Sequence, residues 1–289
     1  MKIAVSLRIL GVLLMLFSST MLVPMVMAIY DGDHTVGGFL WALVITFTAG
    51  LVIWLPSRNK GRRDLMIRDG FMITSLFWTV LGLFGALPFV LTEHLQLSYI
   101  EAAFESISGL TTTGATVIVG LDELPRSILL YRQLLQWLGG IGIIVVAVAV
   151  LPMLGIGGMQ LYRAETPGPS KDSKLTPRIT ETSKALATVY VMLTLACAGA
   201  YYVTGMSGFD AICHAFSTVA IGGFSTHDAS MGYFESEAIL LVCSLFMYIS
   251  AINFGLHFIA WRRRSVGVYG RDSETRFFSA VLLICTAIT

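Results

Sequence analysis

Long runs without Asp, Glu, Lys or Arg divide the chain. Six of them are at least about 20 residues long, the length that an α-helix needs to cross the roughly 30 Å hydrocarbon core of a bilayer. They occupy residues 9–30, 35–57, 70–92, 133–162, 185–209 and 238–261. A segment in lipid has to satisfy its own backbone hydrogen bonds. We therefore predict that each run forms a helix that crosses the membrane once.

The two ends of the chain need separate interpretation. Residues 9–30 could also be a signal peptide, with Lys2 and Arg8 before it and a cleavage site at 26–28. A retained helix is favoured, because the apolar core is long and a second run follows at once. The apolar run from Phe277 to Thr289 is too short to cross, so we expect the sequence to be part of a longer protein.

Two further apolar stretches, 97–121 and 210–227, follow the third and fifth runs. A helix over 99–109 would be about 16 Å long, half a membrane. The segments 110–116 and 219–225 come next and are rich in β-branched residues and Gly, which form helices poorly. Irregular backbone at membrane depth is tolerated only where protein buries it or where it lines a watery cavity. The pattern predicts helix, re-entrant half-helix, extended loop and helix, occurring twice.

A weak internal repeat supports this interpretation. The offset that places Glu101 on Asp210 also places Ser108 on Ser217, and 113–114 on 222–223. A slightly larger offset aligns 137–140 with 248–251. Repeats of this kind indicate one structural unit used more than once.

Composition agrees with a membrane protein. Hydrophobic residues make up 55% of the chain and charged residues 13%, against about 25% charged in soluble domains. An intramembrane enzyme would need clustered acidic, His or Cys side chains at membrane depth, and the runs contain almost none, so we do not expect an enzyme. The four cysteines have neither metal-type nor disulfide-type spacing. No organic cofactor and no nucleic-acid partner are expected.

The net charge of +1 is the sum of two large, opposite charges on the two sides of the membrane. With the N-terminus in the cytoplasm, 17 of the 19 basic residues lie inside and only Arg126 and Arg132 outside, as the positive-inside rule requires. The sides then carry about +10 and −9. An acidic outer mouth concentrates cations. Its predicted carboxylates are Glu93, Glu101, Glu105, Asp122, Glu123, Asp210, Asp228, Glu235 and Glu237.

The loops supply the matching chemistry. Carbonyl oxygens of an extended segment can replace the hydration shell of an ion, and glycine allows the torsions that aim them. The C-terminus of a half-helix adds partial negative charge. These features predict a cation pathway. A sodium or nonselective cation transporter and a non-conducting membrane scaffold subunit remain as alternatives.

Three segments resemble the Trk/Ktr/HKT superfamily of potassium transporters, and most closely its bacterial TrkH-type subunit. They are 111–116, Arg132 with 136–142, and 220–225. The resemblance implies an all-α membrane protein with four helix–pore-loop–helix repeats, preceded by two extra transmembrane helices. Gly114 and Gly223 would be filter glycines, with the carbonyls of Thr111, Thr112, Thr113, Ala220, Ile221 and Gly222 facing a potassium ion. The resemblance also implies that Gly114 favours potassium over sodium.

On this basis the chain divides into five parts. They are a two-helix unit at 1–69, a first repeat at 70–162, a cytoplasmic loop at 163–184, a second repeat at 185–264, and the start of a truncated third repeat at 265–289. We expect a multi-pass protein of the bacterial inner membrane with a cytoplasmic N-terminus. The expected partners are the lipid bilayer, a second copy in a homodimer, and a cytosolic nucleotide-binding regulatory ring of the TrkA type.

Several residues have two interpretations. His214 and His227 could sense pH, although a structural role is the commoner case. Arg132 could brace the filter or extend to the membrane edge. The glycines 139, 140 and 142 could form a hinge or allow close helix packing. Asn253 is expected to hydrogen bond between helices.

Overall fold

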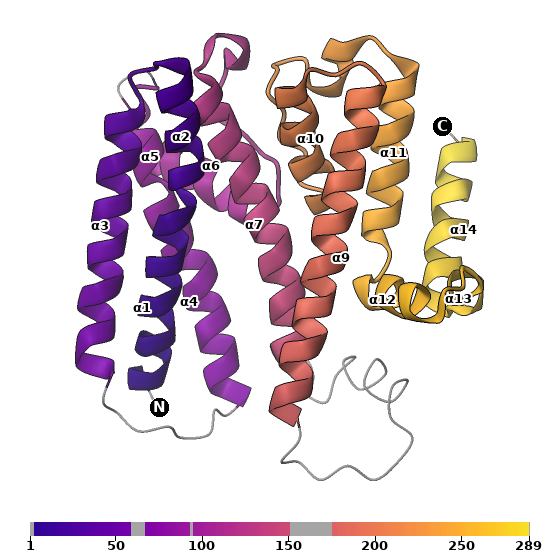
Figure 1. Cartoon of the computed structure of the whole chain (residues 1–289), viewed down its shortest axis with the longest axis horizontal. Coiled ribbons are helices and arrows are strands. Elements are labelled where there is room, and N and C mark those ends of the chain that lie inside the picture. The colour runs from indigo at the N-terminus through magenta and orange to yellow at the C-terminus, as the bar shows by residue number, and fades with distance from the viewer. Residues whose placement is uncertain (1–2, 59–66, 93–94, 151–174, 289) are drawn as a thin grey trace.

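The computed structural model describes residues 3–58, 67–92, 95–150 and 175–288, and within these ranges it contains helices and loops but no strand. The longer helices run up and down beside one another (Figure 1). In chain order, the α-helices of the described residues are α1 Ile3–Thr20, α2 Leu22–Asp31, α3 Val36–Trp54, α4 Ile67–Gly85, α5 Leu87–Leu91, α6 Tyr99–Leu110, α7 Arg126–Val150, α9 Leu175–Val203, α10 Gly208–Ala220, α11 Glu237–Ala251, α12 Phe254–Arg263, α13 Gly267–Arg271 and α14 Ser273–Ile288. Short 3₁₀ turns lie at η1 Leu55–Ser57, η2 Leu121–Glu123 and η5 Ser230–Phe234.

Four segments of the described residues are long and apolar enough to cross a membrane: Ser6–Asp31, Val36–Ser57, Thr74–Leu91 and Ser183–Val203. The first two are the predicted N-terminal pair, in which α1 and α3 touch at small residues. A Cβ on Gly11 would lie 2.7 Å from the Gly50 carbonyl oxygen, and one on Gly50 would lie 2.8 Å from that of Gly11. Glycine is therefore what lets these two helix backbones approach so closely.

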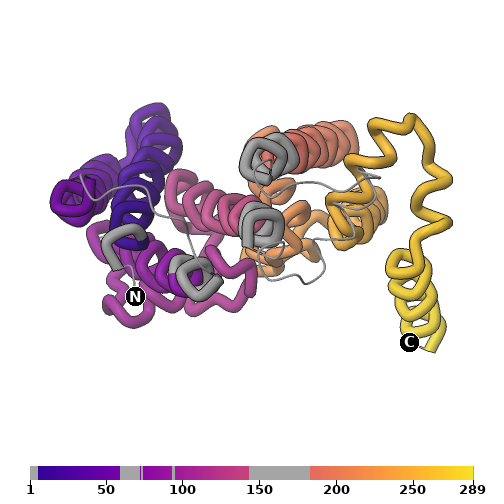
Figure 2. The backbone as a smooth tube through the Cα atoms, turned by 90° about the horizontal axis from the view of Figure 1, so that it is seen from below, coloured from indigo at the N-terminus to yellow at the C-terminus, as the bar shows by residue number. Residues whose placement is uncertain are grey.

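The predicted order of helix, half-helix, loop and helix occurs twice. In the first unit, α4 and α5 precede the 12-residue half-helix α6, and α7 follows its loop. In the second, α9 precedes the 13-residue half-helix α10, and α11 follows. Seen from below, the helices of the two units lie side by side, and α14 stands apart at the C-terminal side (Figure 2). The predicted cytoplasmic loop begins outside the described residues, at 163–174, and its last residues belong to α9.

One predicted element is wrong. Residues 238–261 do not form one straight helix, because α11 ends at Ala251 and α12 leaves it at an angle of 91°. Ile252 between them has extended backbone, and Asn253 also departs from helical torsions. The Asn253 side chain accepts a hydrogen bond from the backbone N–H of Gly255 at 2.9 Å and so caps α12. Asn253 is thus a helix cap, not the bond between helices that we predicted.

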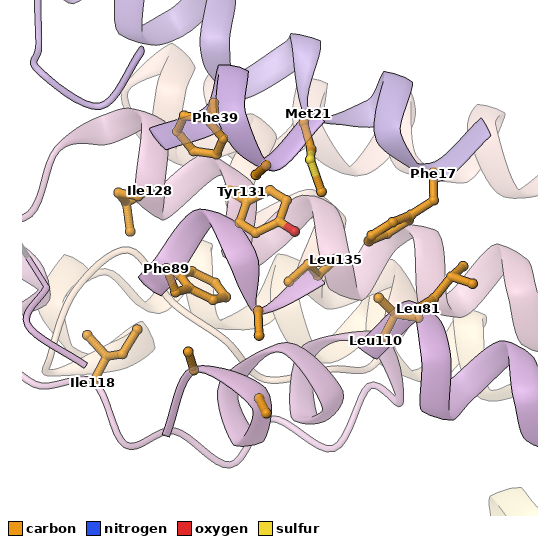
Figure 3. Packing of buried hydrophobic residues seen from close by; sticks show 14 of the residues in the cluster. Phe17, Met21, Phe39, Leu81, Phe89, Leu110, Ile118, Ile128, Tyr131 and Leu135 are labelled. Atoms are coloured by element: carbon orange, nitrogen blue, oxygen red, sulfur yellow. The ribbon is translucent and has the colours of Figure 1, made fainter. Parts of the chain in front are cut away.

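The core of the first unit surrounds Tyr131 of α7. Its ring lies edge-on to Phe39 at 5.5 Å and tilted against Phe89 at 5.2 Å, and Figure 3 shows the three rings together. The buried Tyr131 hydroxyl donates to the Gly85 carbonyl oxygen at 2.8 Å. This contact joins α7 to the α4–α5 corner, so the helix that carries Arg132 is held rigidly in the first unit.

Helix α7 also holds the second unit. The Tyr190 hydroxyl of α9 donates to the Trp137 carbonyl oxygen at 3.1 Å, and the Trp137 indole donates to Thr194 at 3.0 Å. A Cβ on Gly139 would overlap the Leu110 carbonyl oxygen, and one on Gly140 would overlap the Tyr190 hydroxyl. Of the two interpretations of these glycines, the structure supports close packing.

Candidate functional site

The two half-helices begin in the same way. Ser98 and Glu101 form a capping box at α6, in which the Glu101 N–H donates to Ser98 Oγ at 3.3 Å and the Ser98 N–H donates to the Glu101 carboxylate at 2.8 Å. At α10 the Asp210 N–H donates to Ser207 Oγ at 3.1 Å, and the Ser207 hydroxyl donates to the Asp210 carboxylate at 2.7 Å. The two caps are related by the same offset that places Glu101 on Asp210 in the internal repeat.

The half-helices also end in the same way. The N–H of Thr112 donates to the Gly109 carbonyl oxygen at 3.0 Å, and the N–H of Ile221 donates to that of Thr218 at 3.1 Å. One residue further on, the N–H of Thr113 donates to Ser108 at 2.9 Å, and the N–H of Gly222 donates to Ser217 at 2.8 Å. Both pairs recur at the offset that relates the two caps. The weak sequence repeat is therefore a repeat of backbone hydrogen bonds.

Positive φ angles recur at the same spacing. Thr112 and Ile221 have φ of 54° and 53°, and Gly114 and Gly223 have φ of 76° and 86°. Left-handed backbone is easy for glycine but costs a β-branched residue about 1–2 kcal/mol. Alternation of left-handed and other backbone turns successive peptide groups toward the same side, and a binding site lined by backbone groups needs them to point the same way.

The eight predicted filter residues lie where the two half-helices end. Thr111 to Gly114 follow α6, and Ala220 to Gly223 close α10. The two segments touch, because a Cβ on Gly114 would overlap the carbonyl oxygen of Gly222. Segments that lie far apart in the sequence thus meet at their glycines.

Arg132 of α7 lies behind both loops and is fully buried, as is its partner Glu105 on α6. The guanidinium Nε donates to the Glu105 carboxylate at 2.8 Å, Nη2 donates to Thr116 Oγ1 at 3.0 Å, and Nη1 donates to the Ser225 carbonyl oxygen at 3.0 Å. The group also lies 4.4 Å from the centre of the Phe224 ring. Of its two interpretations, Arg132 braces the loops and does not extend to the membrane edge.

The position of Glu105 shows that one of the carboxylates predicted for the acidic mouth is buried instead. Its carboxylate faces inward and accepts from Arg132, from Thr116 Oγ1 at 2.9 Å and from the Val117 N–H at 3.0 Å. It is therefore a brace for the first loop and not a free surface charge. Glu93 lies outside the described residues.

Gln136 is a second side chain of α7 at the second loop, and sequence reasoning assigned it no role. Its Oε1 accepts from the Phe224 N–H at 3.2 Å, and a Cβ on Gly222 would overlap the same side chain. A buried amide one helical turn from Arg132 is the signal that could have drawn attention to it.

His214 takes a structural place in the second unit. Its ring nitrogens bond the Asp210 carbonyl oxygen at 2.9 Å and the Ser225 hydroxyl at 3.0 Å, so both are engaged. Beside it lies a cavity of about 150 Å³, lined by Gly222, Gly223, Cys243, Met247 and other residues of the second loop and α11.

His227 links a loop of the second unit to a loop of the first. Its Nδ1 lies 2.5 Å from the Asp122 carboxylate, its Nε2 lies 3.4 Å from that of Asp210, and its ring stacks on Tyr233 at 3.5 Å. The Asp228 N–H donates to Asp122 at 3.3 Å. The hydrogen bond with His227 lowers the pKa of Asp122 from its ordinary value. Among the described residues, no cluster of His, Cys, Asp and Glu has the arrangement of a metal site.

A family model for TrkH, described as a cation transport protein, matches residues 38–288. The chain belongs to the TrkH family. This is a family of cation transporters and not of enzymes, and the apolar helices agree with a multi-pass membrane protein. The predicted all-α fold with pore-loop units is confirmed.

Relatives match along the whole chain. The Trk system potassium uptake protein TrkH of Halomonas elongata is 58% identical over 292 residues, which cover 100% of this chain and 60% of the relative. The protein of that name from Escherichia coli K12 is 54% identical over 285 residues, covering 97% and 59%. The crystal structure of the potassium transporter TrkH from Vibrio parahaemolyticus superimposes with a TM-score of 0.87 at 50% identity, covering 98% and 57%. This chain thus spans about three fifths of the length of these relatives.

Proposed function

We propose that this TrkH-family chain forms part of a potassium-uptake pore in which backbone carbonyls of the two re-entrant loops hold the ion. The observation that carries the proposal is the duplicated backbone of the loops, with positive φ at 112 and 114 and again at 221 and 223. The two segments meet at Gly114 and Gly222. Relatives of this chain bear the name potassium uptake protein.

The proposed ion ligands are the backbone carbonyls of Thr111, Thr112, Thr113, Ala220, Ile221 and Gly222, with Gly114 and Gly223 allowing the turns. Potassium is the transported ion. Carbonyls that replace the hydration shell favour the ion whose coordination they match. The membrane potential contributes about 2.3 kcal/mol per charge per 100 mV to inward movement.

The remaining parts of the proposal concern the whole protein. The helical units are assigned to 1–69, 70–162, 185–264 and 265–289, with a cytoplasmic loop at 163–184, and two further filter loops would complete the pore. The protein would lie in the bacterial inner membrane with its N-terminus in the cytoplasm. It would form a homodimer and bind a TrkA-type nucleotide-binding ring.

The test is rubidium uptake by the complete natural protein, produced in cells that lack their own potassium uptake. We expect potassium to compete strongly with rubidium for uptake and sodium to compete only weakly. Equal competition by the two ions would favour a nonselective cation transporter. Correctly inserted protein without any uptake would contradict the proposal and favour a scaffold subunit.

A further inference from the structure

One side chain of the first unit bonds the loops of both units. Arg132 donates from Nη2 to Thr116 of the first loop and from Nη1 to the Ser225 carbonyl oxygen of the second. Its third donor, Nε, holds Glu105. A planar guanidinium can serve three acceptors in fixed directions, which the compact ammonium of lysine cannot. The distance between the two loops is thereby tied to one rigid group.

The second unit has no arginine in the corresponding place. At the offset that aligns 137–140 with 248–251, Arg132 and Gln136 correspond to Cys243 and Met247 of α11. These two side chains, whose sulfur atoms lie 3.6 Å apart, line the cavity of about 150 Å³ beside His214. Where the first loop is backed by a charged pair, the second is backed by a cavity.

The second loop is therefore held from the side of the first unit, in addition to the bond from His214 of its own half-helix to the Ser225 hydroxyl. Arg132 bonds the carbonyl of Ser225 at 3.0 Å and lies 4.4 Å from the Phe224 ring, while Gln136 accepts from the Phe224 N–H. Phe224 and Ser225 directly follow Gly223. Movement of these two residues would move the carbonyls that the proposed function assigns to the ion.

We propose that Arg132 is a positioning residue for cation selectivity, which sets the relative placement of the two loops without contacting the ion. The inference rests on the proposed function. A carbonyl-lined filter discriminates between ions through the number and placement of its carbonyls. A shift of one loop against the other changes that placement, so selectivity responds to Arg132 even where folding and transport survive.

The experiment compares variants of the complete natural protein by rubidium uptake at increasing sodium. Arg132→Lys keeps the charge but loses the planar set of N–H donors. Thr116→Val removes the hydroxyl that accepts from Arg132 and donates to Glu105, while the ion pair of Arg132 with Glu105 remains. Arg126→Lys is the matched control, because it makes the same exchange on the same helix, at a half-exposed ion pair with Asp31 away from the loops. Membrane abundance is measured for each.

We expect sodium to compete several-fold more strongly with rubidium in Arg132→Lys, and a smaller change in the same direction in Thr116→Val. In Arg126→Lys the ratio of rubidium uptake with and without sodium should be unaltered. The inference would be overturned if sodium competition were unaltered in both Arg132→Lys and Thr116→Val, or if it changed equally in the control. If Arg132→Lys fails to reach the membrane, Thr116→Val alone decides. If the unmodified protein takes up no rubidium, the proposed function fails instead.

Discussion

Glu105 and His214 occupy equivalent positions in the two units, at the offset that also places Glu101 on Asp210. Each bonds the side chain eleven positions further along the sequence: Glu105 accepts from Thr116, and His214 bonds Ser225. The carboxylate is paired with the buried Arg132, whereas the imidazole bonds a backbone carbonyl oxygen and a hydroxyl. At equivalent positions of the two half-helices, the brace is thus an ion-paired carboxylate in one unit and an imidazole without an ion pair in the other.

Replacing these braces should have unequal costs. Glu105→Ala leaves the Arg132 charge buried without its partner, which costs about 3–5 kcal/mol. His214→Ala removes neutral hydrogen bonds and costs about 1–3 kcal/mol. The measurement is the free energy of unfolding in one detergent, followed for both variants. Equal losses would show that the ion pair is not the stronger brace.

Gly114 and Gly223 separate the effect of backbone torsion from that of crowding. Both have positive φ, so any larger residue is strained, but only at Gly114 does a Cβ also overlap another atom, the Gly222 carbonyl oxygen. We expect Gly114→Ser to weaken potassium over sodium discrimination more than Gly223→Ser. Ion competition in rubidium uptake measures this, with Gly199→Ser, which meets open space, as the control. The reverse order would contradict the packing of the two loops.

The bond between Asp122 and His227 should depend on pH. Because the hydrogen bond lowers the pKa of Asp122, its contribution to stability is complete above the ordinary value of 3.8 and is lost as the pH falls through the lower value in the fold. The titratable groups that face the His227 ring are Asp122, Asp210 and Tyr233, with the His214 ring at 6.4 Å.

The measurement is the midpoint of thermal unfolding for the unmodified chain and for Asp122→Asn across the acid range. The unmodified chain should be more stable near neutral pH, and the difference should shrink as the pH falls below 3.8. A difference that persists unchanged in acid would mean that the Asp122 carboxylate does not form this link.

Asn253 should be replaceable only by other capping residues. Asn253→Ala removes the acceptor for the Gly255 N–H and costs about 1 kcal/mol, whereas Asn253→Asp retains most of the stability. Hydrogen exchange of the first turn of α12 reports the loss locally. Equal exchange in the two variants would show that the 91° bend does not depend on the cap.

The sequence predicted those parts of the fold that depend on local composition. Uncharged runs indicated the long helices, and the short apolar stretches indicated α6 and α10, because length and charge in lipid leave few alternatives. The break at Asn253 was missed because hydropathy averages over it. An Asn directly before the apolar Phe254 is, however, a recognisable N-cap signal.

For the site, the sequence predicted which segments take part but not which side chains bring them into contact. Position along the chain placed Thr111 to Gly114 and Ala220 to Gly223 at the ends of the half-helices. It did not reveal that Arg132 reaches Ser225, or that Gln136 reaches Phe224, since side chains so far apart in the sequence meet only through helix packing. The pairing of Glu105 with Arg132 needs the same three-dimensional information.

Thr112 and Ile221 hold left-handed backbone that β-branched residues resist. A redesign guided by stability alone would place glycine at both positions, with a local gain of about 1–2 kcal/mol each. Glycine would also restore freedom to the two peptide groups that lead into Thr113 and Gly222, because it has many more accessible torsions. The most stable sequence for these loops and the most rigid one are therefore different sequences.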